Sequence, residues 1–321
     1  MKNIDLNSIP SFDELPVRKD APAESSWGVF GDEDALGCLN FLTPAGVVDA
    51  AQLVRSGKVF RLDAKIGFAK PPLFGRAAVV HTVSPLGPTA NDDLLDRFNT
   101  QEGSQWDGLG HVGHFRHERF YNGVTAGETR TGNAKLGIHH WADKFVGRGV
   151  LIDAFGFRKK QGRAVNALAK DVYTLEELEG ALKAQGTTLK PGAILLVRTG
   201  WMESYDTLSA DGKAALAPMD KLSSMGIEAS REMAAWLWNH RVAAIGTDCP
   251  AVEAFPFNFM DEGALHYRAL PLLGLPLGEL FVLAPLAEDC AGDGRYEFMV
   301  VSAPLNLEGG IASPPNAVAI K

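Results

Sequence analysis

The sequence predicts an α/β fold in which strands and helices are mixed along one chain. Short apolar runs typical of buried strands alternate with segments of helical periodicity. The alternation is irregular, which disfavours a (β/α)8 barrel with its eight regular units. Neither a repeat nor a low-complexity linker interrupts the 321 residues. Residues 1–26 are polar and contain three prolines, so we expect them to form an N-terminal arm over a neighbouring surface.

The helices are predicted from capping residues and apolar periodicity. Thr43 is a good N-cap, Pro44 suits the first helical position, and Gly57 is a plausible stop. Residues 174–177 form a capping box, and the helix that they open is expected to end at Gly186. Two more helical stretches are predicted at 228–240 and 266–273.

The strands are predicted from apolar runs between turn signals, with alternation at residues 59–66. The expected strands are 59–66, 147–154, 193–198, 242–246, 280–283 and 296–302, the last of these being the final strand. Residues 67–104 are rich in glycine and proline and have little periodicity. Irregular stretches of this length are usually binding loops or lids, so we expect the loops between Phe68 and Asn99 to shape a pocket.

Composition and charge exclude several classes of function. The formal charge of −8 argues against binding to nucleic acid or to anionic membranes, because both need a basic surface. No basic start precedes an apolar stretch, and no apolar run approaches the ~18 residues of a membrane helix. The three cysteines form no CxxC pair, so we expect free thiols in a reducing, cytoplasmic compartment. Nucleotide-binding glycine motifs are also missing.

The residues most suited to chemistry lie between Gln105 and His117. On a helix, Asp107, His111 and His114 would share one face; on a strand, Gln105, Asp107 and His111 would. In either case Asp107 and His111 converge, and a carboxylate with an imidazole is a common divalent-metal pair. The alternative is a surface turn with hydrogen-bonded histidines. Glycines that permit close approach to a ligand or metal surround the segment, namely Gly103, Gly108, Gly110 and Gly113.

Weaker candidates lie elsewhere in the chain. Asp248 follows a predicted strand, where it serves either to bind a ligand or to form an Asx turn before Pro250. Cys249 has no basic partner that the sequence identifies, so we expect it to be inert. His139 and His140 have no carboxylate at ligand spacing and are expected to be structural.

The segment Gly103-Ser104-Gln105-Trp106-Asp107-Gly108-Leu109-Gly110-His111 resembles the metal-site signature of the cyclase / kynurenine-formamidase-like hydrolase family. That family includes isatin hydrolases and a dienelactone hydrolase, and its usual pattern is His-x-Gly-Thr-His-x-Asp-x-Pro-x-His. The resemblance extends over about residues 27 to 318. Its other matching segments, in order, are 39–44, 195–200, 245–250, His266 with 272–273, and 279–280.

The resemblance implies a swivelling β/β/α single domain with a mixed sheet, covering residues 27–321. It also implies a homo-oligomer, a dimer or a tetramer. The expected cofactor is a divalent metal, with one or two ions of Zn²⁺ or Mn²⁺ that activate a water.

The family's site residues carry over by position. The ligand positions of the first metal fall on Gln101, Gln105 and Asp107. Those of a second ion fall on Asp107, His266 and Glu279. His111 would be the acid/base histidine. The two glutamines depart from the family pattern, which usually has histidines there. Because an amide oxygen is a weaker and harder ligand than imidazole, the departure favours one metal, a manganese-like preference, or recruitment of His111 as a ligand.

These expectations together predict a metal-dependent hydrolase. Its substrate would be small, cyclic or aromatic, with an amide, imide or lactone bond, and Asp107 and His111 would be the catalytic residues. Two alternatives stay open. One is a non-catalytic metabolite-binding homologue that has lost its metal, and the other is a metal-dependent lyase or dehydratase. The expected partner is a small-molecule substrate, with no nucleic acid and no membrane.

Overall fold

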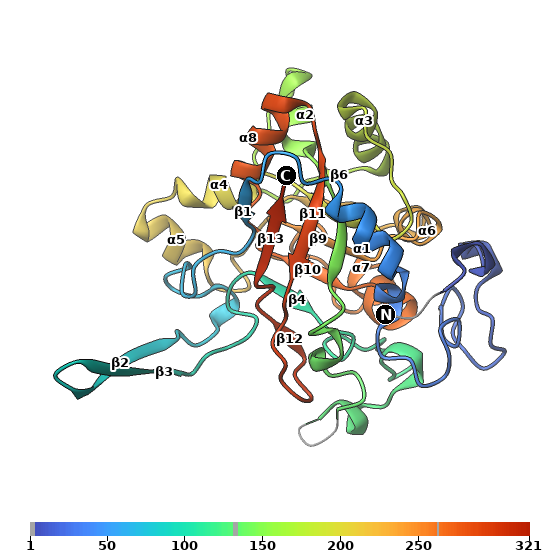
Figure 1. Ribbon diagram of the computed structural model, residues 1–321, viewed down its shortest axis with the longest axis horizontal. Coiled ribbons are helices and arrows are strands. Elements are labelled where there is room, and N and C mark those ends of the chain that lie inside the picture. The colour runs from blue at the N-terminus through green and yellow to red at the C-terminus, as the bar shows by residue number, and fades with distance from the viewer. Residues whose placement is uncertain (1–3, 131–133, 262) are drawn as a thin grey trace.

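A mixed sheet forms the centre of the molecule in the computed structural model, which describes residues 4–130, 134–261 and 263–321. Nine strands of the described residues form this sheet (Figure 1). In spatial order they are β1 (Val59–Arg61), β13 (Ala317–Ile320), β11 (Glu297–Ser302), β5 (Val146–Ile152), β7 (Ile194–Val197), β9 (Ala244–Thr247), β10 (Leu277–Glu279), β4 (Gln105–Asp107) and β12 (Ala312–Ser313).

The middle of the sheet is parallel and its flanks are antiparallel. Neighbours in the series β5, β7, β9 and β10 run parallel. The strands on either side, β11 beside β5 and β4 beside β10, run antiparallel to them. Every residue of β7 and β9 is buried, as expected for parallel strands covered on both faces. The predicted α/β class with a mixed sheet is therefore confirmed.

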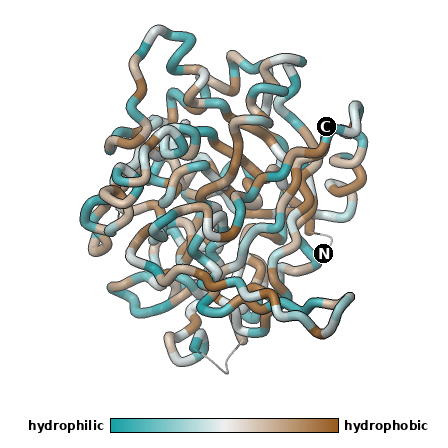
Figure 2. Tube along the Cα trace, turned by 90° about the vertical axis from the view of Figure 1, so that its left-hand side faces the viewer, coloured by the Kyte–Doolittle hydropathy of each residue, from teal (hydrophilic) through white to brown (hydrophobic). Residues whose placement is uncertain are grey.

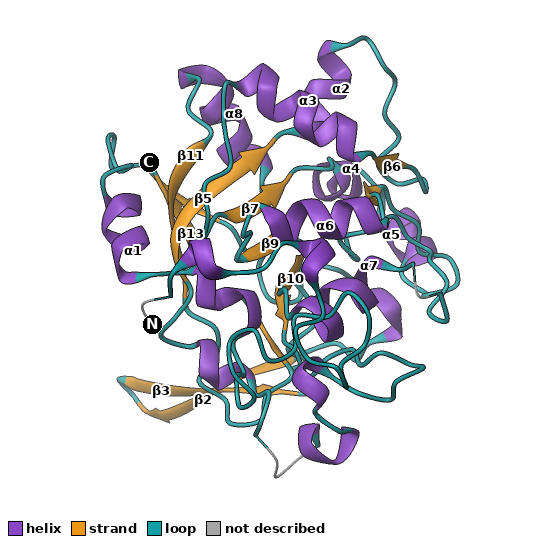
Figure 3. Cartoon of the chain, turned by 90° about the vertical axis from the view of Figure 1, so that its right-hand side faces the viewer, coloured by secondary structure: helices purple, strands orange, loops and turns teal. Residues whose placement is uncertain are grey.

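Helices cover this sheet. Figure 3 shows α6 in front of the sheet, with α2, α3 and α8 gathered at its upper end. The α-helices are α1 (Pro44–Ala51), α2 (Ala154–Lys160), α3 (Leu175–Gln185), α4 (Trp201–Asp206), α5 (Ala210–Leu216), α6 (Arg231–Asn239), α7 (Leu265–Tyr267) and α8 (Ala284–Asp293). α7 runs directly into the π-helical turn η8 (Arg268–Leu273). None of the helices in the described ranges has the length and apolar content needed to cross a bilayer.

Smaller elements complete the described chain. A two-stranded sheet pairs β6 (Val172–Tyr173) with β8 (Gly226–Ile227), and a hairpin pairs β2 (Val80–Gly87) with β3 (Ala90–Asp96). The short 3-10 turns are η1 (Leu6–Ser8), η2 (Phe12–Glu14), η3 (Gly37–Phe41), η4 (Leu73–Gly75), η5 (Tyr121–Gly123), η6 (Ala126–Thr129) and η7 (Ile138–Trp141).

The described part of the N-terminal segment packs on α6 of the same chain. Phe12 is buried in the main core, and its backbone N–H donates to Asn239 Oδ1 at 2.8 Å. The Trp238 indole N–H donates to the Pro10 carbonyl at 2.9 Å. Figure 2 shows hydrophobic stretches of the trace running through the middle of the molecule, where this core lies.

Helix caps were predicted accurately. Thr43 accepts a hydrogen bond from the Gly46 N–H at the start of α1, although α1 ends at Ala51, before the expected stop. The capping box opens α3 as expected, and Gly186 ends it with a left-handed backbone. These signals succeed because capping depends on side chains within one helical turn.

Several predictions of strands, and one of a helix, were wrong. The expected strand at 280–283 lies earlier, as β10, because Leu280 turns into the left-handed region with φ of 56°. The helical alternative for Asp107 to His114 is also wrong, since Asp107 ends β4. Residues 59–66 form only the short β1. The run at 296–302 is not the final strand, because β12 and β13 follow it.

Candidate metal centre

The antiparallel pair β4 and β10 places the central polar residues. Its register sets Gln105 opposite Glu279 and Asp107 opposite Leu277. Because side chains alternate along a strand, Gln105 and Asp107 lie on one face, which Glu279 shares as the partner of Gln105. The Ser104 hydroxyl fixes this edge by donating to the Leu280 carbonyl at 2.5 Å.

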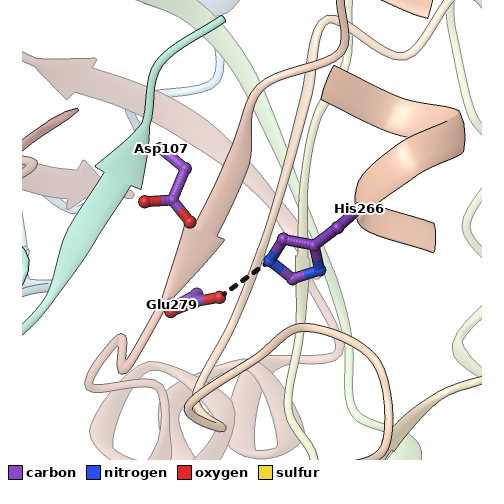
Figure 4. A group of neighbouring side chains, drawn as sticks. All are labelled: Asp107, His266 and Glu279. Carbon is purple, nitrogen blue, oxygen red and sulfur yellow. Dashed lines mark ion pairs between the residues drawn. The ribbon is translucent and has the colours of Figure 1, made fainter. Parts of the chain in front are cut away.

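Asp107, His266 and Glu279 form a buried cluster. One ligand atom of each lies within 4.8 Å of the others, a spacing that could hold a metal ion. Figure 4 shows the three side chains pointing toward one another, Asp107 from β4, Glu279 from β10 and His266 from α7. The cluster joins residues separated by up to 172 positions of sequence, since β4 and β10 are neighbours in the sheet.

Both glutamines predicted from the family pattern contact this cluster. Gln105 Nε2 donates to Glu279 Oε2 at 2.6 Å and lies 3.4 Å from Asp107 Oδ1. Gln101 Nε2 donates to Asp107 Oδ1 at 2.9 Å. Among the described residues, Gln105 Oε1 and Asp107 Oδ2 are buried and have no hydrogen-bond partner. Buried acceptors without a donor are costly, so these two oxygens fit the coordination of a cation.

His111 lies beside the cluster. Its Nε2 is 3.9 Å from Asp107 Oδ1, and Gln101 Nε2 lies 3.3 Å from each ring nitrogen. Burial lowers the pKa of His111 below its usual range, and this effect outweighs the nearby Asp107 carboxylate. The imidazole is therefore neutral at pH 7 and able to accept a proton.

Glu253 is a site residue that sequence reasoning missed. It is buried and accepts three hydrogen bonds, from the backbone N–H of Leu265 and of His266 at 2.9 Å each and from His266 Nδ1 at 2.7 Å. This contact aims His266 Nε2 at Glu279 Oε1, 3.4 Å away. The only local signal was an acidic residue within an apolar segment after a strand.

The electrostatics of the cluster favour a bound positive charge. Burial raises the pKa of Glu279, and the neighbouring Asp107 raises it further. Burial alone would lower the pKa of His266, but its hydrogen bonds with Glu253 and Glu279 outweigh burial and raise this pKa to about 10. Several carboxylates in low dielectric need a compensating cation or proton.

The cluster opens into a cavity of about 230 Å³. Gln105, His111, His266 and Glu279 line its polar end, together with Arg76, which sequence reasoning also missed. Aromatic side chains make up much of the remaining lining, namely Phe74, Phe255, Phe257, Phe259 and Tyr267. Of the loops between Phe68 and Asn99, Phe74 and Arg76 line this cavity, whereas the β2–β3 hairpin projects away from the body of the molecule (Figure 1).

The weaker candidates lie outside this cavity. The Asp248 carboxylate accepts from the Thr199 N–H and hydroxyl and from the Gly200 N–H, which ties the ends of β9 and β7 together. His139 accepts from the Gly309 N–H at 3.4 Å, and His140 contacts a backbone carbonyl, in agreement with structural roles.

The prediction that glycines near Asp107 permit close approach of a ligand or metal is wrong for Gly108. A Cβ there would meet the Ile311 carbonyl oxygen at 2.5 Å, so this glycine permits chain packing and not approach to a ligand. The expectation of free thiols is confirmed, since Cys38, Cys249 and Cys290 are all free and buried. Burial raises the pKa of Cys249 to about 12, which agrees with an inert thiol.

Comparisons with known proteins agree with this fold. Residues 79–254 match the model of the Cyclase family, described as "Putative cyclase". A crystal structure titled as a novel cyclase is 34% identical, with 92% of this chain and 99% of that chain covered and a TM-score of 0.82. Isatin hydrolase A from Labrenzia aggregata, bound to benzyl benzoate, is 17% identical over 84% of this chain and 94% of that chain, with a TM-score of 0.57.

A more distant structure has the same fold. It is titled a predicted metal-dependent hydrolase from Bacillus stearothermophilus and is 16% identical over 82% of this chain and 97% of that chain, with a TM-score of 0.50. A search of curated protein sequences found no match.

Proposed function

Because the chain belongs to the Cyclase family, we propose that it is a metal-dependent hydrolase of small molecules. It would cleave an amide, imide or lactone bond. The observation that carries the proposal is the buried cluster of Asp107, His266 and Glu279, which opens into a largely apolar cavity. Among the described residues, Asp107 Oδ2 and the neighbouring Gln105 Oε1 are buried oxygens without a partner. Enclosed apolar pockets with a few convergent polar groups are typical of catalytic sites.

The donor set fits one divalent ion. Two carboxylates and an imidazole are ordinary ligands of Zn²⁺ and Mn²⁺, and the Gln105 amide oxygen adds a neutral, hard donor. Glu253 holds the Nδ1 side of His266, so the Nε2 side faces Glu279 and would be the side that binds an ion. When bound, a divalent ion would lower the pKa of water and polarise the scissile carbonyl.

His111 is the proposed proton carrier. As a neutral imidazole it takes one proton from the attacking water, whose oxygen bonds to the acyl carbon. The same proton then passes to the leaving nitrogen or oxygen as its bond to carbon breaks, so the water is divided between the two product groups. Gln101, which contacts both His111 and Asp107, holds the imidazole beside the cluster.

The direct test is Asp107→Ala, with metal content and rate measured on the same preparations purified without chelators. Wild-type protein is expected to carry about one divalent ion per chain and to hydrolyse at least one of a panel of arylformamides, isatin, lactones and cyclic imides. Asp107→Ala should lose the ion and at least about 100-fold in kcat/KM, because even outer partners of metal ligands contribute 10- to 100-fold. The exposed Asp92→Ala is the matched control and should keep both.

Two other outcomes would contradict the proposal. If wild-type protein purified in this way carries no ion and takes up none, the chain is a metabolite-binding homologue. If a reaction occurs in oxygen-18 water without label entering the product acid, the activity is elimination and not hydrolysis. Full activity of Asp107→Ala on a wild-type substrate would also refute the assigned site.

A further inference from the structure

Arg76 lines the cavity, and most N–H groups of its guanidinium donate to no protein acceptor among the described residues. Nη1 donates to the Gln101 backbone carbonyl, and the guanidinium lies 4.9 Å from the centroid of the Phe74 ring. Among the described residues it takes part in no ion pair within 4.0 Å. A guanidinium has five N–H donors, so most of those of Arg76 remain for a ligand in the cavity that it lines.

The charges around Arg76 place it at the polar end of the cavity. Burial lowers the pKa of its guanidinium, while the negative charges of Glu279, Asp107 and Glu102 act in the opposite direction. Arg76 therefore lies within electrostatic reach of the cluster that would hold the ion. No Arg76 nitrogen is among the buried atoms without a partner in the described residues, so its remaining N–H groups are open to solvent and to a ligand oxygen in the cavity.

Aromatic side chains line the cavity beside this polar end. Phe257 stacks on the His266 imidazole, with 5.3 Å between ring centroids and 23° between planes. Phe255 and Phe259 pack around Phe257, and Tyr267 lines the same cavity. Apolar cavities of about 150 Å³ hold benzene, so about 230 Å³ is enough for one substituted ring.

We infer that Arg76 is a specificity-determining residue that selects aromatic acyl compounds. The ring lies among the phenylalanines of the cavity lining, and the guanidinium donates to the acyl oxygen of the substrate and then to the carboxylate that cleavage leaves. A planar guanidinium can bind a carboxylate through two parallel hydrogen bonds, which an ammonium cannot do. This inference rests on the proposed function and goes beyond it by naming the substrate class.

The experiment measures ligand affinity, so that it does not depend on turnover. Benzoate and benzamide, which have the same ring and differ in the acyl group, are titrated by calorimetry into metal-loaded wild-type protein, Arg76→Met and Arg76→Lys. Wild type is expected to bind benzoate at least about 10-fold more tightly than benzamide, since charge-assisted bidentate pairs are the strong ones. Arg76→Met should lose most of this preference, keeping only the part that the ion supplies, and Arg76→Lys should fall between Arg76→Met and wild type.

Controls separate ligand binding from a structural role. Arg55→Met removes an exposed arginine outside the cavity and should behave as wild type. Bound metal is measured in every variant and should not change. If Arg76→Met binds benzoate as tightly as wild type, or loses benzamide as much as benzoate, Arg76 does not select the acyl group. If wild type binds neither ligand, the substrate class is wrong.

Failure of the inference can be distinguished from failure of the proposed function. A wild-type protein that takes up no divalent ion refutes the metal-dependent hydrolase, whatever Arg76 binds. Normal metal binding and hydrolysis with no benzoate preference refute only the role of Arg76. Should Arg76→Met not fold, Arg76→Lys still decides the question, because full wild-type preference in that variant would exclude bidentate recognition.

Discussion

His111 and the carboxylate cluster have separate positions and, by our proposal, separate tasks. His111 Nε2 lies 3.9 Å from Asp107 Oδ1, and Gln101 lies next to both residues. Burial keeps the His111 imidazole neutral near pH 7 by lowering its pKa. A neutral imidazole beside the ligands, facing the cavity, is suited to accept a proton from water.

We therefore expect His111→Ala to keep its metal and to lose about 10²- to 10⁴-fold in kcat, the usual contribution of a general acid–base group. Because the base acts in its neutral form, wild-type kcat/KM should fall as pH drops through an apparent pKa below 6.5. The variant should lack this acidic limb. Metal analysis checks that the variant keeps its ion, and pH–rate profiles check that the fall in rate at acidic pH is missing. If His111→Ala loses its metal, His111 is a ligand and not the acid–base group.

Single residues were predictable where a motif named them. The pattern around Gln105 to His111 identified Asp107 and His111, and the matching order of segments added His266 and Glu279, all of which the structure brings together. Glu253 and Arg76 could not be found in this way. Each is a lone charged residue in an irregular segment, and only tertiary contacts give it a site to act on.

At the scale of single elements, α3 is fixed by an ion pair as well as by its caps. Arg158 in α2 donates to both carboxylate oxygens of Glu177, at 2.7 and 2.6 Å, and only 3% of its side chain is exposed. Burial by itself raises the pKa of Glu177, but hydrogen bonds from Arg158 and the Thr174 N–H outweigh it and lower this pKa to about 2.

Glu177→Gln is expected to lower the free energy of unfolding by about 2 kcal/mol at pH 7, because it replaces two charge-assisted hydrogen bonds of Arg158 and leaves Asp171 as its remaining carboxylate partner. The folded pKa is below the ordinary 4.5, so this contribution is complete well above pH 4.5 and is lost as pH falls toward 2. The difference from wild type should therefore shrink by about 1 kcal/mol between pH 7 and pH 4. Urea unfolding at both pH values measures it, with the exposed Glu179→Gln on the same helix as control. A difference independent of pH would contradict the ion-pair account.

Helices and strands were predictable where capping residues mark their ends and where one face is buried and the other exposed. Caps and periodicity gave α3 and α6, although α6 begins at Arg231, after its Ser230 cap, and not at residue 228. The β2–β3 hairpin gave no alternation, because all of its residues are exposed and neither face needs to be apolar. The two-residue strand β12 is too short for any sequence period and exists only by pairing with β4.

At the scale of the whole molecule, the fold class followed from sequence but the strand order did not. Strands β4 and β10, which build the site, have only three residues each and are paired by the twist and register of the whole sheet. Only the family resemblance indicated that the residues of β4 and β10 lie close together. The β2–β3 hairpin was predicted neither from residue patterns nor from the family resemblance.

No other part of the described chain covers this hairpin, and it exposes several apolar side chains. Val80, Val83, Leu86, Leu94 and Leu95 are between 43% and 68% exposed. Figure 1 shows the hairpin projecting from the body. Long exposed strands with apolar residues are templates for association, and contiguous apolar surface commonly marks an interface. We propose that this hairpin contacts a second copy of the chain and supports the expected homo-oligomer.

Replacing Val83 and Leu94 together by lysine should shift the protein toward monomer, because lysines on an exposed strand oppose association. Sedimentation velocity at micromolar concentration measures the change, and the melting temperature should stay within about 2 °C, since surface substitutions usually alter stability by less than 0.5 kcal/mol. Val48→Lys is the matched control, because Val48 is 61% exposed on α1, away from the hairpin. A wild type that sediments as a monomer, or a double variant that sediments as the wild-type oligomer, would exclude the hairpin as the assembly surface.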